Sequence, residues 1–275
     1  MQQKILHSSL ISIEKFLERD QVYIMINTSD IVAFCDEVTQ KNNIPDFQGS
    51  VNGLQLENHG EVTKIGAAVD AGLVPFQKAV ERNIDFIVVH HGLFWNPPIP
   101  IRGVDFKKIN LCISNNLAVY SSHLPLDCHP EIGNNVILAK KLGLSVERGF
   151  LQFEKNNIGL IARNQLSRVE LKEKLDTLFP KGCKSLEFGT EKPKMIGILS
   201  GSGQSAVEKL QDEGVDTLIT GELKQNHFNY AQENNLNIYL CGHYATETFG
   251  VKALAKKISE EFNIPHEFIP TECPI

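Results

Sequence analysis

The stretch DFIVVHH, residues 85–91, decides the class of fold. A short apolar run rich in β-branched residues is typical of a strand buried on both faces, which occurs in parallel sheets. Apolar side chains at helical spacing precede it at residues 73–83, with Pro75 in the first turn. Another apolar run, residues 64–70, precedes that helix. The order strand, helix, strand predicts a βαβ unit within an α/β protein.

The same alternation continues to the end of the chain. Further strands are predicted at residues 117–121, 158–162, 195–199, 217–220 and 237–240. Further helices are predicted at residues 134–142, 168–179, 206–213, 225–235 and 246–262. The sequence therefore predicts an α/β fold with largely parallel strand pairing.

Composition excludes several classes of protein. The chain has 275 residues, of which 42% are hydrophobic and 22% charged, so it can bury a core without help from a metal or a disulfide. A net charge of −6 argues against nucleic acid or an anionic membrane as a partner. No apolar run approaches the roughly 18 residues of a membrane span. Six scattered cysteines fit free thiols in a reducing compartment, so we expect a cytoplasmic protein.

Segments of the two halves match at polar as well as apolar positions. Residues 115–120 (NNLAVY) resemble residues 234–239 (NNLNIY), and each segment leads to a histidine with a carboxylate four residues later. We interpret this as an internal duplication rather than a chance similarity of alternating elements. The expected organisation is an extension at residues 1–27, a first lobe at 28–150 and a second at 151–275. Met25 is an alternative initiator, which would make the first 24 residues a translation-start artefact.

Histidines gather where predicted strands end. His90 and His91 close one strand, and the pairs His123/Asp127 and His243/Glu247 follow two others. Side chains at the carboxyl ends of parallel strands meet in a crevice, and imidazole with carboxylate suits Zn, Fe, Mn, Co or Ni. Two neighbouring metals could activate a water molecule between them. The alternative is a set of core histidines that are hydrogen-bonded to carboxylates.

These motifs also resemble a known family. The segments HHGLFW (90–95), HLPLD (123–127), TGE (220–222), GHYATE (242–247) and NGLQLE (52–57) are similar to those of the GTP cyclohydrolase I type 2 homologues, or NIF-three-like proteins. The resemblance implies two similar lobes, a toroidal homohexamer and two divalent metal ions per subunit. It places the metal ligands at His90, His91, Asp127, His243 and Glu247, with Glu247 bridging the ions.

The function expected from this resemblance is metal-dependent hydrolysis of a small molecule. If the family name describes this chain, the substrate is GTP and water attacks C8 of the purine. We assign proton transfer to His123 and Glu222, and the turn at residues 200–205 could hold an anionic group. The alternatives are a metal-handling scaffold without turnover and a hydrolase of another nucleotide or of a peptide bond.

Overall fold

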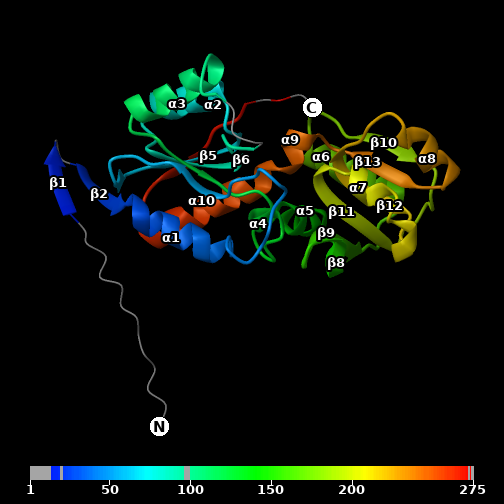
Figure 1. Cartoon of the computed structure of the whole chain (residues 1–275). Helices are drawn as coiled ribbons and strands as arrows, with labels where there is room; N and C mark the ends of the chain where they lie inside the picture. Colours follow the sequence, from blue (N-terminus) through cyan, green and yellow to red (C-terminus); the bar gives the residue numbers. More distant parts are fainter. Residues whose placement is uncertain (1–13, 19–20, 96–99, 272, 274–275) are drawn as a thin grey trace, which may run out of the picture.

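Three parallel strands form the centre of the first lobe (Figure 1). The computed structural model describes residues 14–18, 21–95, 100–271 and 273. Its five-stranded sheet has the order β14 (His266–Phe268), β5 (Ile65–Asp70), β6 (Phe86–His91), β7 (Ala118–Ser121) and β3 (Gly53–Leu56). All neighbours are parallel except β3 and β7. The βαβ unit predicted around residues 64–91 is therefore present.

The second lobe also has three parallel strands at the centre of its sheet. Its six-stranded sheet has the order β10 (Lys184–Glu187), β13 (Asn237–Leu240), β12 (Thr217–Glu222), β11 (Met195–Ser202), β9 (Asn156–Arg163) and β8 (Ser145–Phe153). The parallel strands are β11, β12 and β13, and antiparallel β10 borders β13 as β3 borders β7. The expectation of two related α/β lobes is confirmed, although both sheets are mixed because antiparallel strands border the parallel ones.

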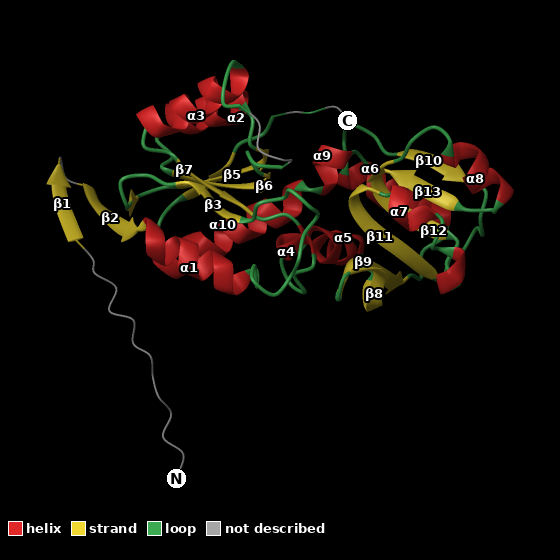
Figure 2. Ribbon diagram, viewed as in Figure 1, coloured by secondary structure: helices red, strands yellow, loops and turns green. Residues whose placement is uncertain are grey.

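Helices cover both faces of each sheet (Figure 2). In the first lobe these are α2 (Leu73–Glu81) and α3 (Val104–Ser114) on one face, and α1 (Thr28–Val38) and α10 (Thr248–Phe262) on the other. Strand β6 shows why, because Phe86 and Val88 pack toward α10 whereas Ile87 and Val89 pack toward α2. A strand buried on both faces is uniformly apolar, as the sequence predicted.

The second sheet is covered in the same way. Helices α5 (Asn134–Leu142) and α6 (Arg168–Leu178) pack on one face. The other face is covered by α7 (Gln204–Val207), Leu210 and α8 (His227–Glu233), and the 3-10 turn η1 (Gln211–Glu213), which has no buried residue, follows Leu210. Two four-residue helices, α4 (Leu124–Asp127) and α9 (His243–Thr246), follow β7 and β13. They occupy equivalent positions in the two repeats.

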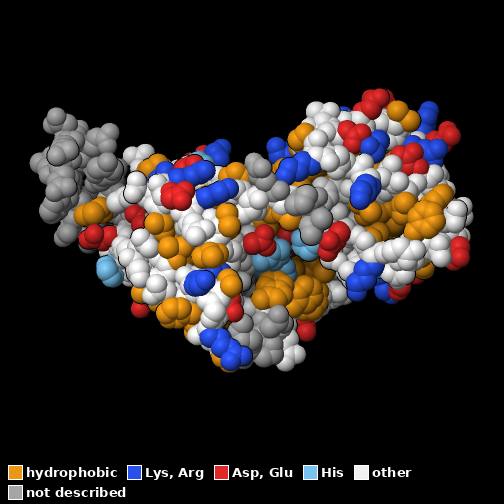
Figure 3. Space-filling model, turned by 90° about the horizontal axis from the view of Figure 1, so that it is seen from above, with side chains coloured by type: hydrophobic (Ala, Val, Ile, Leu, Met, Phe, Trp, Pro, Cys, Tyr) orange, Lys and Arg blue, Asp and Glu red, His pale blue; other side chains and the backbone are white. Residues whose placement is uncertain are grey.

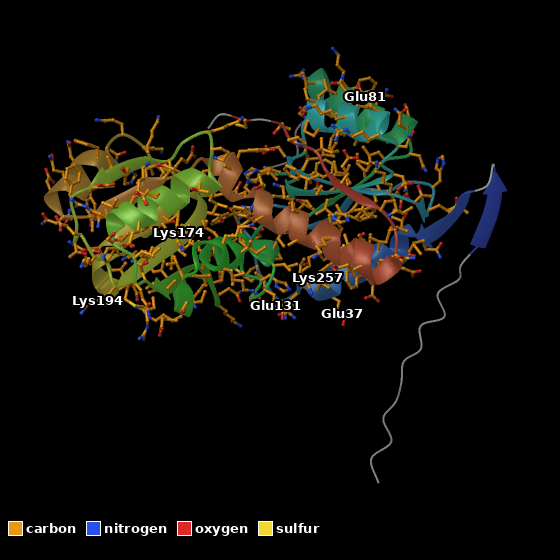
Figure 4. All side chains as sticks on the ribbon, turned by 180° about the vertical axis from the view of Figure 1, so that it is seen from behind. Glu37, Glu81, Glu131, Lys174, Lys194 and Lys257 are labelled. Atoms are coloured by element: carbon orange, nitrogen blue, oxygen red, sulfur yellow. The ribbon has the colours of Figure 1, made fainter. Side chains whose placement is uncertain are left out.

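The C-terminal segment crosses back to the first lobe. Helix α10 packs on β5 and β6, and β14 pairs with β5 in parallel. Figure 4 shows Lys257 of α10 close to Glu131, and their charged atoms lie 3.6 Å apart. This ion pair is exposed and contributes little stability. The division of the chain at residue 150 stays a prediction, but the first sheet includes strands from both sides of that residue.

A small separate sheet lies at the N-terminal end of the described chain. It consists of β1 (Glu14–Glu18), β2 (Gln21–Asn27) and β4 (Glu61–Val62). Met25 lies within β2, and the next residue, Ile26, is buried in the core between the first sheet and α10. The extension predicted at residues 1–27 therefore ends in a strand, and its residues 1–13 and 19–20 lie outside the described part.

Two predicted helices differ from those observed. The helix expected at 206–213 is split into α7 and η1, because bonds from Lys209 N to Ala206 O and from Glu213 N to Leu210 O tighten the chain. The helix expected at 246–262 begins at Thr248, since Glu247 has φ −101° and ψ 2° between α9 and α10. Within the described residues, no helix is long and apolar enough to cross a membrane.

Candidate metal centre

The carboxyl ends of the parallel strands face one another where the two lobes meet. His90 and His91 end β6, His123 follows β7, and His243 follows β13. Figure 3 shows the molecule from above, with histidine side chains gathered in a hollow near its middle and acidic and hydrophobic side chains beside them. The structure therefore brings together histidines that are up to 153 residues apart in the sequence.

Each of these four histidines bonds Nδ1 to an oxygen atom. His90 bonds the carbonyl of Ser122 at 2.9 Å, and the other three bond carboxylates. These bonds join His91 to Asp70 at 2.8 Å, His123 to Asp46 at 2.8 Å and His243 to Glu222 at 3.0 Å. An outer acceptor at Nδ1 fixes the orientation of an imidazole and leaves Nε2 as its donor atom for a metal.

Glu247 lies among the Nε2 atoms of three histidines. Its Oε1 is 3.2 Å from His243 Nε2 and 3.7 Å from His90 Nε2, and its Oε2 is 3.4 Å from His91 Nε2. Glu247 is 3% exposed, so its charge is almost entirely removed from water. A buried carboxylate with imidazoles at both oxygens is an arrangement that could hold a metal ion.

Asp127 completes one side of the cluster. Its Oδ2 lies 3.4 Å from His90 Nε2, while its Oδ1 accepts a hydrogen bond of 2.8 Å from Asn134. Two groups of three residues could each hold a metal ion, because within each group one ligand atom per residue lies within 4.8 Å of the other two. These groups are His90/His91/His123 and His91/His243/Glu247. His91 belongs to both groups. All five predicted ligands and His123 therefore lie in one cluster.

Two observations indicate that this cluster fits a cation. Nε2 of His90 and Oε2 of Glu247 are buried, and neither has a hydrogen-bond partner. Buried polar atoms are rarely left unpaired unless a ligand or ion satisfies them. Gly201 also leaves the space open, because a Cβ atom there would collide with Glu247 Oε1 and approach His243 Nε2 to 3.1 Å.

The electrostatics of the cluster favour positive charge. Burial lowers the pKa of His90, but Asp127 and Glu247 outweigh it and raise that pKa to about 10. The hydrogen bond to Glu247 is the main cause that raises the pKa of His243 to about 9. Burial raises the pKa of Asp127, yet the nearby His90 imidazole lowers it overall. Carboxylates that attract protons to these imidazoles also attract a divalent cation.

A cavity of about 350 Å³ opens onto the cluster. Its walls include Phe47 and Trp95, together with Ser202 at the end of β11 and Gln204 at the start of α7. The turn predicted at residues 200–205 is therefore the end of a strand and the start of a helix, joined by Gly203. The Trp95 ring lies edge-on to His123, with centroids 4.5 Å apart. A larger cavity of about 690 Å³ lies between α5 and β8–β9 and shares Asp127, but none of the four clustered histidines lines it. The smaller cavity is therefore the candidate substrate site.

Sequence reasoning missed two partners of the histidines, Asp46 and Asp70. Asp70 ends β5 beside His91, so the rule that located the histidines at strand ends could have found it. Asp46 lies in the loop after α1 and meets His123 across 77 residues of sequence, and no local pattern marks that contact. Glu222 was predicted as a catalytic residue, and the structure places its carboxylate against His243.

Comparison with known proteins covers nearly the whole chain. The family model described as Duf34/NIF3 (NGG1p interacting factor 3) matches residues 26–274. The match begins within β2 and includes both sheets and every residue of the cluster.

Curated relatives and solved structures agree with this match. A Pyrococcus horikoshii protein named GTP cyclohydrolase 1 type 2 homolog is 38% identical over 250 residues, 89% of this chain and 98% of the relative. A Deinococcus radiodurans protein of the same name is 35% identical over 246 residues, 89% of this chain and 93% of the relative. The crystal structure of TTHA1606 from Thermus thermophilus is 35% identical with a TM-score of 0.81, covering 90% of this chain and 100% of that one.

Proposed function

The chain belongs to the Duf34/NIF3 family, and from this premise we propose that it is a metal-dependent hydrolase that opens the purine ring of GTP. The family predicted from the strand-end motifs is confirmed, and relatives at 35% and 38% identity carry the name GTP cyclohydrolase 1 type 2 homolog. The name supports a nucleotide substrate. The reaction itself is argued from the site.

One observation carries the proposal. The buried Glu247 carboxylate lies within 3.7 Å of the Nε2 atoms of His90, His91 and His243, and two of these buried atoms lack a partner. Each unpaired buried polar atom lowers the stability of the fold by about 1–3 kcal/mol. Such atoms are therefore unexpected in a core whose residues serve stability alone. The arrangement is explained if the atoms bind metal.

We assign the metal ligands to residues on both sides of Glu247. His90 and Asp127 would hold one divalent ion and His91 and His243 the other, with Glu247 bridging them. The donor set of imidazole and carboxylate suits Zn, Fe, Mn, Co or Ni. When bound, two such ions would supply Lewis acidity and lower the pKa of the attacking water.

The chain's own residues would orient the substrate and move protons. Trp95 and Phe47 offer aromatic surface for a purine beside His123. Attack of water at C8 would break the C8–N9 bond and open the five-membered ring to a formamide, and a second water would then hydrolyse the formamide and release C8 as formate. His123, which lines the cavity, would move the protons of this reaction, and Glu222 would orient His243 through Nδ1.

The test is a nucleotide panel assayed with metal-loaded protein. Formate and ring-opened product from GTP, lost in His90→Ala, would support the proposal. Phosphate release without formate would instead indicate hydrolysis of another bond. Two bound metals with no turnover on any nucleotide would indicate a metal-handling scaffold, and the proposed reaction would be wrong.

Two further expectations belong to this proposal. We propose a homohexamer, for which light scattering should give roughly six times the chain mass of 30.7 kDa. We also place the protein in the cytoplasm, because six scattered cysteines suit a reducing compartment. Fractionation with a tagged chain would test the location.

A further inference from the structure

Asp46 and His123 form a buried pair at the wall of the cavity. Nδ1 of His123 lies 2.8 Å from Oδ1 of Asp46, and the Asp46 side chain is 4% exposed. The ion pairs of His90, His91 and His243 include Glu247, whereas that of His123 is with Asp46. His123 therefore has the outer partner of a metal-binding histidine but a different inner environment.

Four donors converge on the carboxylate of Asp46. Oδ1 accepts from His123 and from the backbone of Phe47, at 2.8 and 2.7 Å. Oδ2 accepts from Asn52 Nδ2 at 2.8 Å and from the backbone of Leu124 at 3.0 Å. Burial raises the pKa of Asp46, but these bonds and the nearby imidazole outweigh it and lower the pKa to about 2. An ionised carboxylate only accepts hydrogen bonds, so Nδ1 of His123 carries the proton.

The second ring nitrogen of His123, Nε2, belongs to a residue that lines the cavity. The backbone N–H of His123 donates to Asn52 Oδ1 at 2.8 Å, Nδ1 bonds Asp46, and the Trp95 ring lies against the imidazole. These three contacts fix the position of His123. The metal-ligating atoms of His90, His91 and His123 lie within 4.8 Å of one another. In the neutral imidazole, the Nδ1 atom bonded to Asp46 carries the proton and Nε2 has the free lone pair.

We propose that Asp46 is a positioning residue that fixes His123 with an unprotonated Nε2 toward the cavity, where it accepts a proton from the attacking water. This inference rests on the proposed function. In the step, an O–H bond of the water breaks and an N–H bond forms at Nε2, while the water oxygen bonds to C8 and the π pair of the C8–N7 double bond moves onto N7. The positive charge that develops on the ring faces the Asp46 carboxylate.

Replacement of Asp46 by asparagine tests this arrangement with little change in shape. Asn52 and Leu124 both donate to the Oδ2 side, so the amide oxygen of the variant should stay there. The amide NH₂ then faces His123 and can only donate. Nδ1 must accept that bond, which moves the ring proton to Nε2 and removes the lone pair from the cavity.

The experiment compares zinc-loaded wild type and Asp46→Asn, both labelled with ¹⁵N-histidine. Solid-state NMR of the sedimented protein should show the His123 proton on Nδ1 in the wild type and on Nε2 in the variant. Zinc content should remain the same in both proteins. Formate release from GTP should fall by about 100-fold or more in the variant.

Asp70→Asn is the matched control, because Asp70 bonds Nδ1 of the proposed ligand His91 in the same way. It should weaken zinc binding by about 10–100-fold. If Asp46→Asn lost zinc to the same degree, His123 would be a ligand and the proposal would be overturned. An unchanged His123 tautomer in Asp46→Asn would also overturn it.

A second variant covers the case in which Asp46→Asn does not fold. His123→Gln should keep its zinc and lose formate release by about 100-fold or more. Where Asp46→Asn does fold, adding it to His123→Gln should cause no further loss. A wild type without turnover would refute the proposed function alone, because the tautomer comparison would still decide whether Asp46 positions His123.

Discussion

Nε2 of His243 lies 3.2 Å from Oε1 of Glu247, although the two residues belong to different short segments of the chain. His243 begins α9, and Glu247 stands at the break between α9 and α10. The two residues are four apart in the sequence, a spacing that also brings side chains together within a helix. Glu247 is both the C-terminal cap of α9 and the N-terminal cap of α10, so its carboxylate is held at the junction of the two helices.

Glu247→Gln should lower bound metal from two equivalents to at most one. The amide keeps the size of the side chain but has no charge, and a bridging ligand contributes to both sites. Elemental analysis of protein purified with excess zinc measures the effect. Glu260→Gln on the exposed face of α10 is the control and should keep both equivalents. Full occupancy in Glu247→Gln would contradict the bridging assignment.

Metal affinity should rise with pH between about 6 and 9. The carboxylates raise the pKa of His243 to about 9 and of His90 to about 10, so protons occupy these imidazoles below those values. A metal ion must displace the protons, and the displacement becomes easier as pH rises. Calorimetry in buffers of different ionisation enthalpy should detect proton release at pH 7. Affinity that is constant across this range would contradict the raised pKa values.

The strands and the residues at their ends could be predicted from the sequence, because the pattern that marks a buried strand lies within a few consecutive residues. A uniformly apolar run identifies a strand such as β6, and the sheet architecture determines where His90 and His91 must lie. The 120-residue offset between His123 and His243 likewise predicted that the two lobes would be related, and β7 and β13 have equivalent positions in the two sheets.

Other features depended on tertiary contacts and could not be predicted. The contact of Asp46 with His123 arises from loop packing, which leaves no periodic pattern. The helix break at Glu247 runs against local propensity, because residues 246–262 have continuous helical spacing. The pairing of β14 with β5 likewise joins segments about 200 residues apart.

Asn134→Ala should destabilise the fold and weaken one metal site. Asn134 is fully buried, donates to Asp127 Oδ1 at 2.8 Å and accepts from Gly250 N at 2.7 Å. Its loss leaves the Gly250 N–H unpaired, at a cost of about 1–3 kcal/mol, and frees the Asp127 carboxylate. Thermal unfolding and zinc titration measure the two effects.

The neighbouring residue Asn135 provides the comparison for this prediction. Asn135 is equally buried but bonds the Ile158 carbonyl and the Ser200 N–H, so neither bond goes directly to a proposed ligand. Asn135→Ala should lower stability by a similar amount and change zinc affinity less. Equal loss of zinc affinity in both variants would show that Asn134 has no particular role at Asp127.

Gly201→Ala should reduce metal binding more than it reduces stability. Gly201 has φ +65°, where an L-residue costs roughly 1 kcal/mol, and its added Cβ would collide with Glu247 Oε1. Gly214 has φ +68° with nothing within 4 Å of an added Cβ, so Gly214→Ala carries the backbone cost alone. Gly201→Ala should lose at least as much stability as Gly214→Ala in denaturant titrations, and only Gly201→Ala should lose zinc. If the two variants bound zinc equally well, the space at Gly201 would have no role in the metal centre.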